Sequence, residues 1–373
     1  MERSTTRLRV GVVGCGLVAQ VMHLPYLREL HHRFEVAAVC DISPAALAHA
    51  GSVFPEAGRH AAWEDVLAEH LDAVLVLTPG SHAPLALAAA ETGRHVFVEK
   101  PMCLNPDEGR EMVDAAAAAG VVLMVGYMKR YDPAYEELAR TLDLGAIRFA
   151  RLTTLESPLE PYVAHYPLTL GARDVDPQLL ADLAADDAER VALALPDEDE
   201  LSRRVYRAVL LDSMVHELNG VRGLLGEPSE LHFARITNGT VHVSLAFGEV
   251  ECAALWLDLP GIARYEQDWS FYGAKERAGL RFPSPFLRSE PTELVREGGE
   301  PGTPNAWRTV QTVSYEEAFK RELVEFHAAV SEGRAPRTNG EDGLRDVLLC
   351  QAIVRAHVQG RGIAAPTALA AAA

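Results

Sequence analysis

Leu8-Arg9-Val10-Gly11-Val12-Val13 runs directly into Gly14-Cys15-Gly16-Leu17-Val18-Ala19, and this stretch decides the fold. The first half is apolar and rich in valine, which predicts a buried strand. Gly14 permits a tight turn, Gly16 lets the backbone approach a pyrophosphate, and Ala19 allows close packing of the next helix. The amino end of that helix offers N–H groups and a favourable dipole to phosphates. The alternative is a tight turn of small residues without a ligand. We expect a dinucleotide-binding loop whose contacts with the cofactor come from Gly14, Gly16, Leu17 and Val18.

Strands and helices alternate after this loop as far as Gly126. Ser43 is a typical N-cap before Pro44, and Gly93 is a typical stop after an alanine-rich helix. The alternation predicts an α/β Rossmann fold, a doubly wound parallel sheet, over residues 1–128. The further strands are expected at Glu35–Cys40, Asp72–Leu77, Val96–Val98 and Val121–Val125.

The pattern changes over residues 129–373, where several strands joined by short turns predict an α+β domain with a mostly antiparallel sheet. Asn238-Gly239 is a strong hairpin signal. Residues 158–200 carry many acidic side chains and few basic ones, and we interpret them as an acidic, partly helical insertion on the surface. The stretch Phe282–Asn305 is rich in Pro, Gly and Glu and is predicted to be a loop. Strands are expected at Arg148–Leu155, Leu231–Ile236, Val241–Phe247, Glu251–Asp258 and Tyr265–Tyr272, with closing helices at about Tyr315–Ser331 and Gly343–Gln359.

Composition excludes several classes of function. The net charge of −18 over 373 residues makes nucleic acid a poor partner, because phosphate binding needs a basic surface. No apolar run is long enough to span a bilayer, and the N-terminus has no signal-peptide pattern, so we expect no membrane partner and no export. The five cysteines are scattered and odd in number, which argues against disulfides and a zinc site and favours a reducing cytoplasm.

Asp41 closes the second strand, where a carboxylate can accept hydrogen bonds from both hydroxyls of an adenosine ribose and repels a 2′-phosphate. No arginine follows in Ile42-Ser43 to hold such a phosphate, so NAD is expected and NADP is disfavoured. The alternative role of Asp41 is a capping turn before the next helix, and one carboxylate can serve both. Thr78, Pro79 and His82 follow the next strand and would border the nicotinamide half, although an ordinary loop histidine is the competing interpretation of His82.

The strand Val96–Val98 ends in Glu99-Lys100-Pro101, because proline fixes its own φ and cannot donate to a sheet. Ligands bind beyond the carboxyl ends of parallel strands, and a lysine at such an end can point into a cleft. Solvated charges at a strand end are the competing interpretation. Asp212 and His216 are four residues apart, which places them on one face of a helix, as an active-site pair or as a common surface pair.

Together these motifs resemble the Gfo/Idh/MocA family of oxidoreductases. The resemblance rests on the glycine loop, on Val98-Glu99-Lys100-Pro101-Met102, on Asp212-Ser213-Met214-Val215-His216 and on the junction Gly126–Pro133. It covers most of the chain except Pro158–Asp199, and the family's usual aspartate is replaced by Asn219. The resemblance implies a Rossmann domain followed by a domain with a large open sheet, oxidation of a secondary alcohol of a sugar or cyclitol, and assembly into dimers or tetramers through that sheet.

In this interpretation Lys100, Asp212 and His216 are catalytic, with His216 or Lys100 taking the hydroxyl proton and Asp212 holding a neighbouring hydroxyl or orienting the imidazole. Glu99 supports Lys100 or the cofactor. A redox-neutral lyase or glycosidase that recycles bound NAD is an alternative on the same scaffold, as is a non-catalytic NAD-binding regulator or a C=N or C=C reductase. Candidate substrate contacts are Arg130, Tyr131, His165, Tyr166 and Asn219, and Arg130 has a structural ion-pair role as its alternative.

Overall fold

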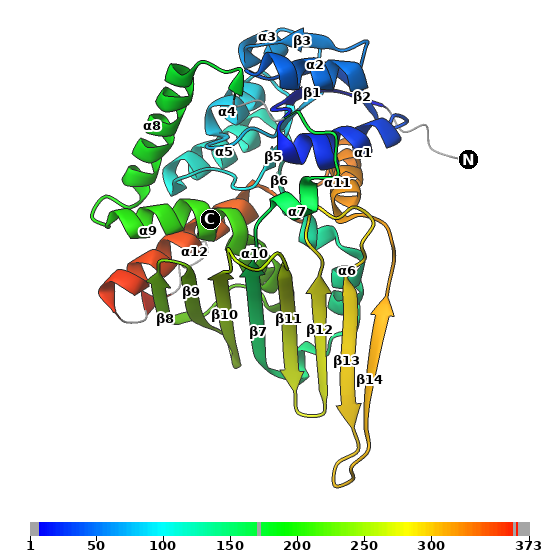
Figure 1. Cartoon of the computed structure of the whole chain (residues 1–373), viewed down its shortest axis with the longest axis vertical. Coiled ribbons are helices and arrows are strands. Elements are labelled where there is room, and N and C mark those ends of the chain that lie inside the picture. The colour runs from blue at the N-terminus through cyan, green and yellow to red at the C-terminus, as the bar shows by residue number, and fades with distance from the viewer. Residues whose placement is uncertain (1–6, 170–172, 361–362, 365–373) are drawn as a thin grey trace. The chain divides into compact units, whose positions relative to one another are not determined.

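The computed structural model describes residues 7–169, 173–360 and 363–364 (Figure 1). The polar N-terminal stretch expected to precede the first strand lies outside the described residues up to residue 6, as do residues 170–172 of the acidic insertion and 361–362 of the closing segment. The chain forms two compact units. Unit 1 comprises Met1–Tyr127, Tyr166–Pro196 and Phe319–Val347, and unit 2 comprises Met128–His165, Asp197–Ala318 and Leu348–Ala373.

Unit 1 is built on a parallel sheet that has six strands within the described residues. Neighbouring strands pair in parallel among the described residues, and β1 lies between β2 and β4, so the strand order reverses at the loop after β1. Such a reversal places a binding crevice at the carboxyl ends of the strands. The predicted doubly wound Rossmann sheet is therefore confirmed. Its order is β3-β2-β1-β4-β5-β6, with β1 Leu8–Val13, β2 Phe34–Cys40, β3 Gly58–His60, β4 Ala73–Val76, β5 His95–Glu99 and β6 Leu123–Gly126.

Two helices of unit 1 begin at side-chain caps, of which Ser43 was predicted. The Ser43 hydroxyl accepts from the Ala46 N–H at 3.1 Å, and the Asn105 side chain accepts from the N–H groups of Asp107 and Glu108 at 3.0 Å. Gly93 follows α4 with φ +77°, as expected for a helix stop. The helical segments are the π-helical turn Ala19–His23, α1 Leu24–Glu29, α2 Pro44–Val53, α3 Trp63–Leu67, α4 Ala83–Glu91, α5 Pro106–Ala119, α8 Pro177–Ala194 and α11 Ala318–Glu332, while α12 Gly340–Gln359 runs from unit 1 into unit 2.

The division into units is discontinuous along the chain. The first stretch of unit 1 ends at Tyr127, and the domain boundary was predicted at residue 128. Most of the acidic insertion, predicted as part of the second domain, instead groups with unit 1, as does the first closing helix. The reason is contact: the insertion is tied by hydrogen bonds to loops of the parallel sheet, and α11 covers aromatic side chains of the same sheet.

Unit 2 contains a larger sheet with nine strands among the described residues. Within it β7 and β10 run parallel and the other pairings among the described residues are antiparallel, so the predicted mostly antiparallel sheet is confirmed. Gly239 occupies the predicted hairpin turn with φ +108°. The order is β14-β13-β12-β11-β7-β10-β9-β8-β15, with β7 Ile147–Glu156, β8 Glu230–Thr237, β9 Thr240–Phe247, β10 Val250–Asp258, β11 Glu266–Gly273, β12 Glu276–Phe282, β13 Glu293–Gly299, β14 Ala306–Thr312 and β15 Ile363–Ala364.

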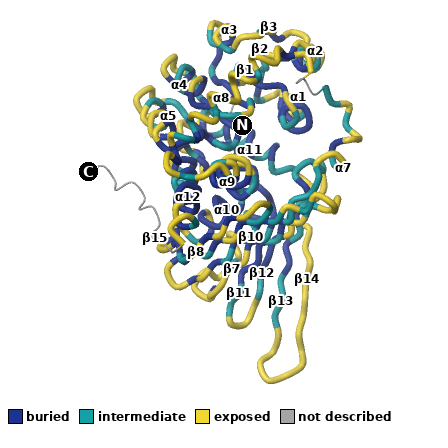
Figure 2. Tube along the Cα trace, turned by 60° about the vertical axis from the view of Figure 1, so that its left-hand side comes forward, coloured by how far each residue is buried: buried dark blue, intermediate teal, exposed yellow. Residues whose placement is uncertain are grey.

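One face of this sheet is buried and the other is open. Trp269 and Phe271 of β11 point to the buried face, and a Cβ at Gly220 would collide with the Trp269 ring, so the helix carrying Gly220 packs directly on the strand. Alternate side chains such as Phe149 and Arg151 of β7 face outward. Figure 2 shows the exposed strands at the β14 edge of the sheet. The helices of unit 2 are α6 Pro133–Thr141, α7 Glu160–Val163, α9 Glu200–Val205, the π-helical segment Tyr206–Met214 and α10 Val215–Leu225, with 3-10 turns at Met128–Tyr131 and Leu144–Ala146.

The loop predicted over Phe282–Asn305 is wrong in part, because β13 lies inside it. The strand pairs with β12 and β14 along its whole length. Its sequence, Glu-Leu-Val-Arg-Glu-Gly-Gly, lacks the regular alternation on which strand prediction depends. No helix among the described residues is both long enough and apolar enough to cross a bilayer.

Candidate active site

The glycine loop after β1 has the shape that a dinucleotide needs. Gly14 has φ +93°, and a Cβ there would lie 2.6 Å from the Leu77 carbonyl carbon and the Thr78 nitrogen, so only glycine fits. A Cβ at Gly16 would meet no heavy atom within 4 Å, so the space beside it is open. Leu17 and Val18 are partly exposed at the start of the helix. The loop therefore leaves room for a pyrophosphate at a helix N-terminus.

Asp41 lies beside this loop, beyond the end of β2. Its carboxylate accepts hydrogen bonds from the Cys15 N–H and from the Ser43 N–H, each at 2.7 Å. A carboxylate has about four lone-pair sites, so these two bonds leave capacity for ribose hydroxyls. The capping-turn role and the ribose role proposed for Asp41 are thus compatible in one side chain.

His82 joins the ends of β4 and β5. Its Nε2 lies 2.6 Å from the Thr78 carbonyl oxygen, and its Nδ1 lies 2.7 Å from the Pro101 carbonyl oxygen. The ring is buried, and burial lowers the pKa of His82. Both ring nitrogens face backbone oxygens, so neither is available to a ligand in this arrangement. Thr78 and Pro79, by contrast, keep exposed surface at the sheet edge.

Glu99 and Lys100 point to different environments. Glu99 is buried, its Oε1 lies 2.6 Å from His23 Nε2, and its Oε2 accepts from the Lys100 N–H at 3.1 Å. Lys100 keeps partial exposure directly beyond the strand, and its peptide bond to Pro101 is cis. The strand end therefore fixes the lysine backbone with the buried carboxylate and leaves the lysine side chain at the sheet edge.

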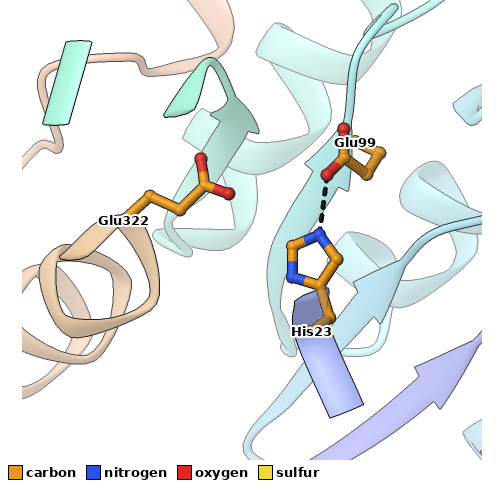
Figure 3. Close-up of side chains that lie close together, drawn as sticks. All are labelled: His23, Glu99 and Glu322. Carbon is orange, nitrogen blue, oxygen red and sulfur yellow. Dashed lines mark hydrogen bonds and ion pairs between the residues drawn. The ribbon is translucent and has the colours of Figure 1, made fainter. Parts of the chain in front are cut away.

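Glu322 of α11 completes a buried cluster with His23 and Glu99, whose carboxylate and imidazole groups converge in Figure 3. One ligand atom from each of the three residues lies within 4.8 Å of the others. The 2.6 Å contact between His23 and Glu99 is a hydrogen bond, and it is shorter than the separation of about 3.4 Å expected for two ligands on one tetrahedral ion. This geometry favours a shared proton over a metal ion.

The protonation of Glu322 follows from its surroundings. Neither carboxylate oxygen has a hydrogen-bond partner among the described residues, and the side chain is fully buried. Burial, with the nearby Glu99 carboxylate, raises the pKa of Glu322 well above its ordinary value. Burial therefore favours the protonated, neutral form of Glu322.

A strap, which we define as residues 166–169 and 173–196, follows the carboxyl edge of the parallel sheet, with α8 on the side of α4 and α5 (Figure 1). Gln20 donates to the Thr169 carbonyl at 2.7 Å and accepts from the Thr169 N–H at 2.8 Å. Asp187 accepts from the Ser81 N–H at 3.3 Å, close against Gly80. Arg190 forms an ion pair with Glu108 of α5. These contacts were not predicted from the sequence, because their partners are far apart along the chain.

Asp212 and His216 lie on one helical stretch of unit 2. Asp212 belongs to the π-helical segment and is exposed, and His216 lies in the first turn of α10 and is partly exposed. Both side chains are thus accessible, as a catalytic role requires. Lys100 belongs to unit 1, whereas Asp212 and His216 belong to unit 2.

A buried polar cluster that the sequence interpretation missed surrounds Glu217, the residue after His216. Its carboxylate accepts hydrogen bonds from Thr154 and Gln267, and burial raises its pKa. Lys129, also buried, has its Nζ 4.7 Å from the centroid of the Phe282 ring. Their positions in the sequence could have pointed to both residues, because Lys129 precedes the candidate Arg130 and Glu217 follows the candidate His216.

Of the five candidate substrate contacts, Tyr131 and Asn219 lie in the interior and Arg130 is partly exposed. The Arg130 guanidinium donates to the Asn219 side-chain and main-chain oxygens at 3.2 and 3.3 Å, and Asn219 and Tyr131 are fully buried. The alternative named for Arg130, a structural role, fits these contacts, with a neutral amide in place of an ion-pair partner. His165 is exposed and Tyr166 is partly exposed, and the two residues stand on either side of the division between the units.

Comparison with known proteins agrees with this geometry. Residues 8–127 match the family model described as an oxidoreductase family with an NAD-binding Rossmann fold. Myo-inositol 2-dehydrogenase of Thermotoga maritima is 24% identical over 95% of this chain and 98% of its own length. Inositol 2-dehydrogenase 3 of Saccharopolyspora erythraea is 28% identical over 97% of this chain and 96% of its own length.

Two solved structures show the same fold. A levoglucosan dehydrogenase in complex with NADH and levoglucosan superposes with a TM-score of 0.74 at 18% identity, over 97% of this chain and 100% of that chain. A 3-ketoreductase from Actinomadura kijaniata in complex with NADP gives a TM-score of 0.69 at 20% identity, over 95% of this chain and 98% of that chain.

The fold and the glycine loop define a nicotinamide-dinucleotide oxidoreductase. Residues 8–127 belong to the Gfo/Idh/MocA family of oxidoreductases with an NAD-binding Rossmann fold.

Proposed function

We propose that this protein is an NAD-dependent dehydrogenase that interconverts a secondary alcohol and a ketone on a sugar or cyclitol. The observation that carries the proposal is the open dinucleotide loop at Gly16, on a chain that aligns over nearly its whole length with inositol dehydrogenases. The relatives reported above are dehydrogenases, which favours net oxidation over the redox-neutral lyase or glycosidase.

Gly14, Gly16, Leu17 and Val18 hold the pyrophosphate through the helix N-terminus, and Asp41 accepts from the ribose hydroxyls. Thr78 and Pro79 border the nicotinamide. When bound, NAD supplies the acceptor for the hydride of the alcohol carbon. The carboxylate of Asp41 and the absence of an arginine in Ile42-Ser43 support NAD over NADP.

Lys100, Asp212 and His216 carry the proton chemistry in this proposal. The Lys100 ammonium stabilises charge on the substrate oxygen, and the His216 imidazole has an intrinsic pKa suited to accept the hydroxyl proton. Asp212 holds a neighbouring hydroxyl. The choice between His216 and Lys100 as base is decided by the pH dependence of kcat: His216→Asn removes a titration near neutral pH if the imidazole is the base.

Glu99 and His82 position this machinery without touching the substrate. Glu99 accepts from the Lys100 N–H, and His82 ties the Pro101 carbonyl to the end of β4. Arg130, Tyr131 and Asn219 have a comparable structural role in unit 2, which the burial of Tyr131 and Asn219 and the hydrogen bonds from Arg130 to Asn219 support. His165 and Tyr166, which keep exposed surface, remain the substrate contacts that we propose.

The open face of the large sheet supports assembly into a homodimer or homotetramer. It presents Phe149, 38% exposed, and Phe233, 39% exposed, among polar side chains. The five cysteines are all buried thiols, which supports our proposal of a reducing, cytoplasmic setting.

The test is a screen for NAD reduction at 340 nm over inositols, hexoses and glycosides. Accumulation of NADH in proportion to a polyol supports the proposal. Conversion of a glycoside without accumulation of NADH would establish the redox-neutral alternative, and tight NAD binding without turnover of any substrate would favour a regulator.

A further inference from the structure

Asp174 of the strap occupies the amino end of α2. Its Oδ1 accepts from the Ser43 hydroxyl at 2.8 Å, and its Oδ2 accepts from the Ala45 N–H at 2.9 Å. Asp174 is exposed, whereas the next residue, Val175, is buried and anchors the strap. The carboxylate therefore uses two donors that a helix start offers to an anion.

Asp41 binds the same serine from the other side of the loop, because it accepts from the Ser43 N–H at 2.7 Å. Ser43 is thus held by two carboxylates, one from β2 and one from the strap. A 2′-phosphate on the adenosine ribose lies beyond the residue that accepts from the ribose hydroxyls, toward the turn that follows that strand. In this chain that turn is Ile42-Ser43, and its anion-binding donors are already taken.

We propose that Asp174 is a specificity-determining residue that excludes NADP, by repelling the 2′-phosphate and by occupying its donors at the start of α2. This inference rests on the proposed function, in which Asp41 and the glycine loop bind the dinucleotide. It assigns a task to the acidic insertion, a segment to which the family resemblance does not extend. Selectivity for NAD then comes from two carboxylates on separate segments of the chain.

The test measures the dissociation constants of NAD⁺ and NADP⁺ by isothermal titration calorimetry for the full-length protein and for Asp174→Asn. The substitution keeps the size of the side chain and removes its charge. We expect the NADP⁺ to NAD⁺ ratio of dissociation constants to fall about threefold or more, the size of one exposed charge interaction, while NAD⁺ affinity stays within about twofold. The difference should shrink at high salt, because the interacting groups are exposed.

Asp182→Asn is the matched control. Asp182 is exposed on α8, where it accepts from Gln178, and it carries the same charge, so its removal tests a general change in net charge. We expect the ratio to be unchanged in this variant. An unchanged ratio in Asp174→Asn, an equal fall in Asp182→Asn, or a preference for NADP⁺ in the unsubstituted protein overturns the inference. Failure of the unsubstituted protein to bind either dinucleotide overturns the proposed function instead.

Discussion

Two carboxylates on one helix show how the surroundings of a side chain set its protonation in this protein. Glu322 and Glu325 lie on the same helix, α11, and their pKa values move in opposite directions. Burial raises that of Glu322, whereas the hydrogen bonds from Arg334, at 2.8 and 2.9 Å, lower that of Glu325. The two residues therefore form a matched pair for a test of linkage between protonation and folding.

The effect of Glu322→Gln on the free energy of unfolding is expected to be more favourable at pH 8 than at pH 5. The folded-state pKa is raised, so unfolding releases a proton above the unfolded value of about 4.5, and stability falls as pH rises from there toward the folded pKa. The substitution removes this loss, which amounts to about 1.4 kcal/mol for each pH unit that separates the unfolded and folded pKa values. Urea denaturation at both pH values measures the effect of the substitution on the free energy of unfolding. If the substitution destabilises the protein at pH 8 as much as at pH 5, or more, then Glu322 is ionised in the folded state.

Glu325→Gln should behave in the opposite sense. Its folded-state pKa is lowered, so the charged pair contributes stability above the unfolded pKa and loses it as pH falls through the folded value. The expected cost is about 0.5–1 kcal/mol at pH 8 and close to zero at low pH. The same denaturation series serves as the control for Glu322→Gln.

In the proposed mechanism the Lys100 ammonium faces the substrate oxygen, so Lys100→Met, which keeps the apolar stem and removes this charge, should lower kcat by roughly 10²- to 10⁴-fold. The dissociation constant of NAD⁺ should change little, since the loop and Asp41 carry the dinucleotide. Stopped-flow reduction of NAD and calorimetry separate the two quantities. Full activity in this variant would remove Lys100 from the mechanism.

At the scale of elements, we expect the two glycines of the loop to have different roles: Gly14 is needed for folding and Gly16 for binding of the dinucleotide. Gly14 has φ +93° and no space for a Cβ, so Gly14→Ala should cost at least about 1–2 kcal/mol of stability. Gly16→Ala should leave the melting temperature nearly unchanged, because its Cβ meets nothing, and should weaken NAD⁺ binding by about tenfold or more, since the methyl group stands where the pyrophosphate approaches. Calorimetry and thermal melts on both variants distinguish these outcomes, and unimpaired binding in Gly16→Ala would place the pyrophosphate elsewhere.

Much of the fold could be predicted because local signals agree with the tertiary structure. The caps Ser43 and Asn105, the stop at Gly93 and the turn at Asn238-Gly239 all act through neighbouring residues. β14 had no such signal, since every residue in it is exposed and no buried face imposes an alternating pattern. The π-helical segments were also missed as such, because their sequences have ordinary helical spacing.

The site was predictable only where it is local in sequence. The glycine loop, Asp41 and the strand end at Lys100 each follow a strand directly. The cluster of His23, Glu99 and Glu322 and the contact of Asp174 with Ser43 join segments that only the folded chain brings together. Spacing rules carry no information about such pairs, so neither was foreseen.

For the whole molecule, the open face of the large sheet leads to a prediction about assembly. Phe149 on β7 and Leu255 on β10 face outward from adjacent parallel strands, so the double variant Phe149→Glu/Leu255→Glu should convert an oligomer to a monomer. Light scattering coupled to size-exclusion chromatography measures the mass. Leu193→Glu, which alters a 70% exposed side chain on α8, is the control and should not change it. An unaltered mass in the double variant would place the interface elsewhere.

The discontinuity of unit 1 has a consequence for how the chain is made. His23 and Phe97 pack edge-on against Phe319 and Phe326 of α11, so the last part of the nucleotide-binding unit is synthesised after strands β7 to β14 of the large sheet. Contacts of such high sequence separation slow folding and leave apolar surface uncovered in the meantime. A nascent chain that has released only its first 128 residues therefore carries an incomplete core, and chaperone engagement at that stage should outlast the synthesis of the parallel sheet.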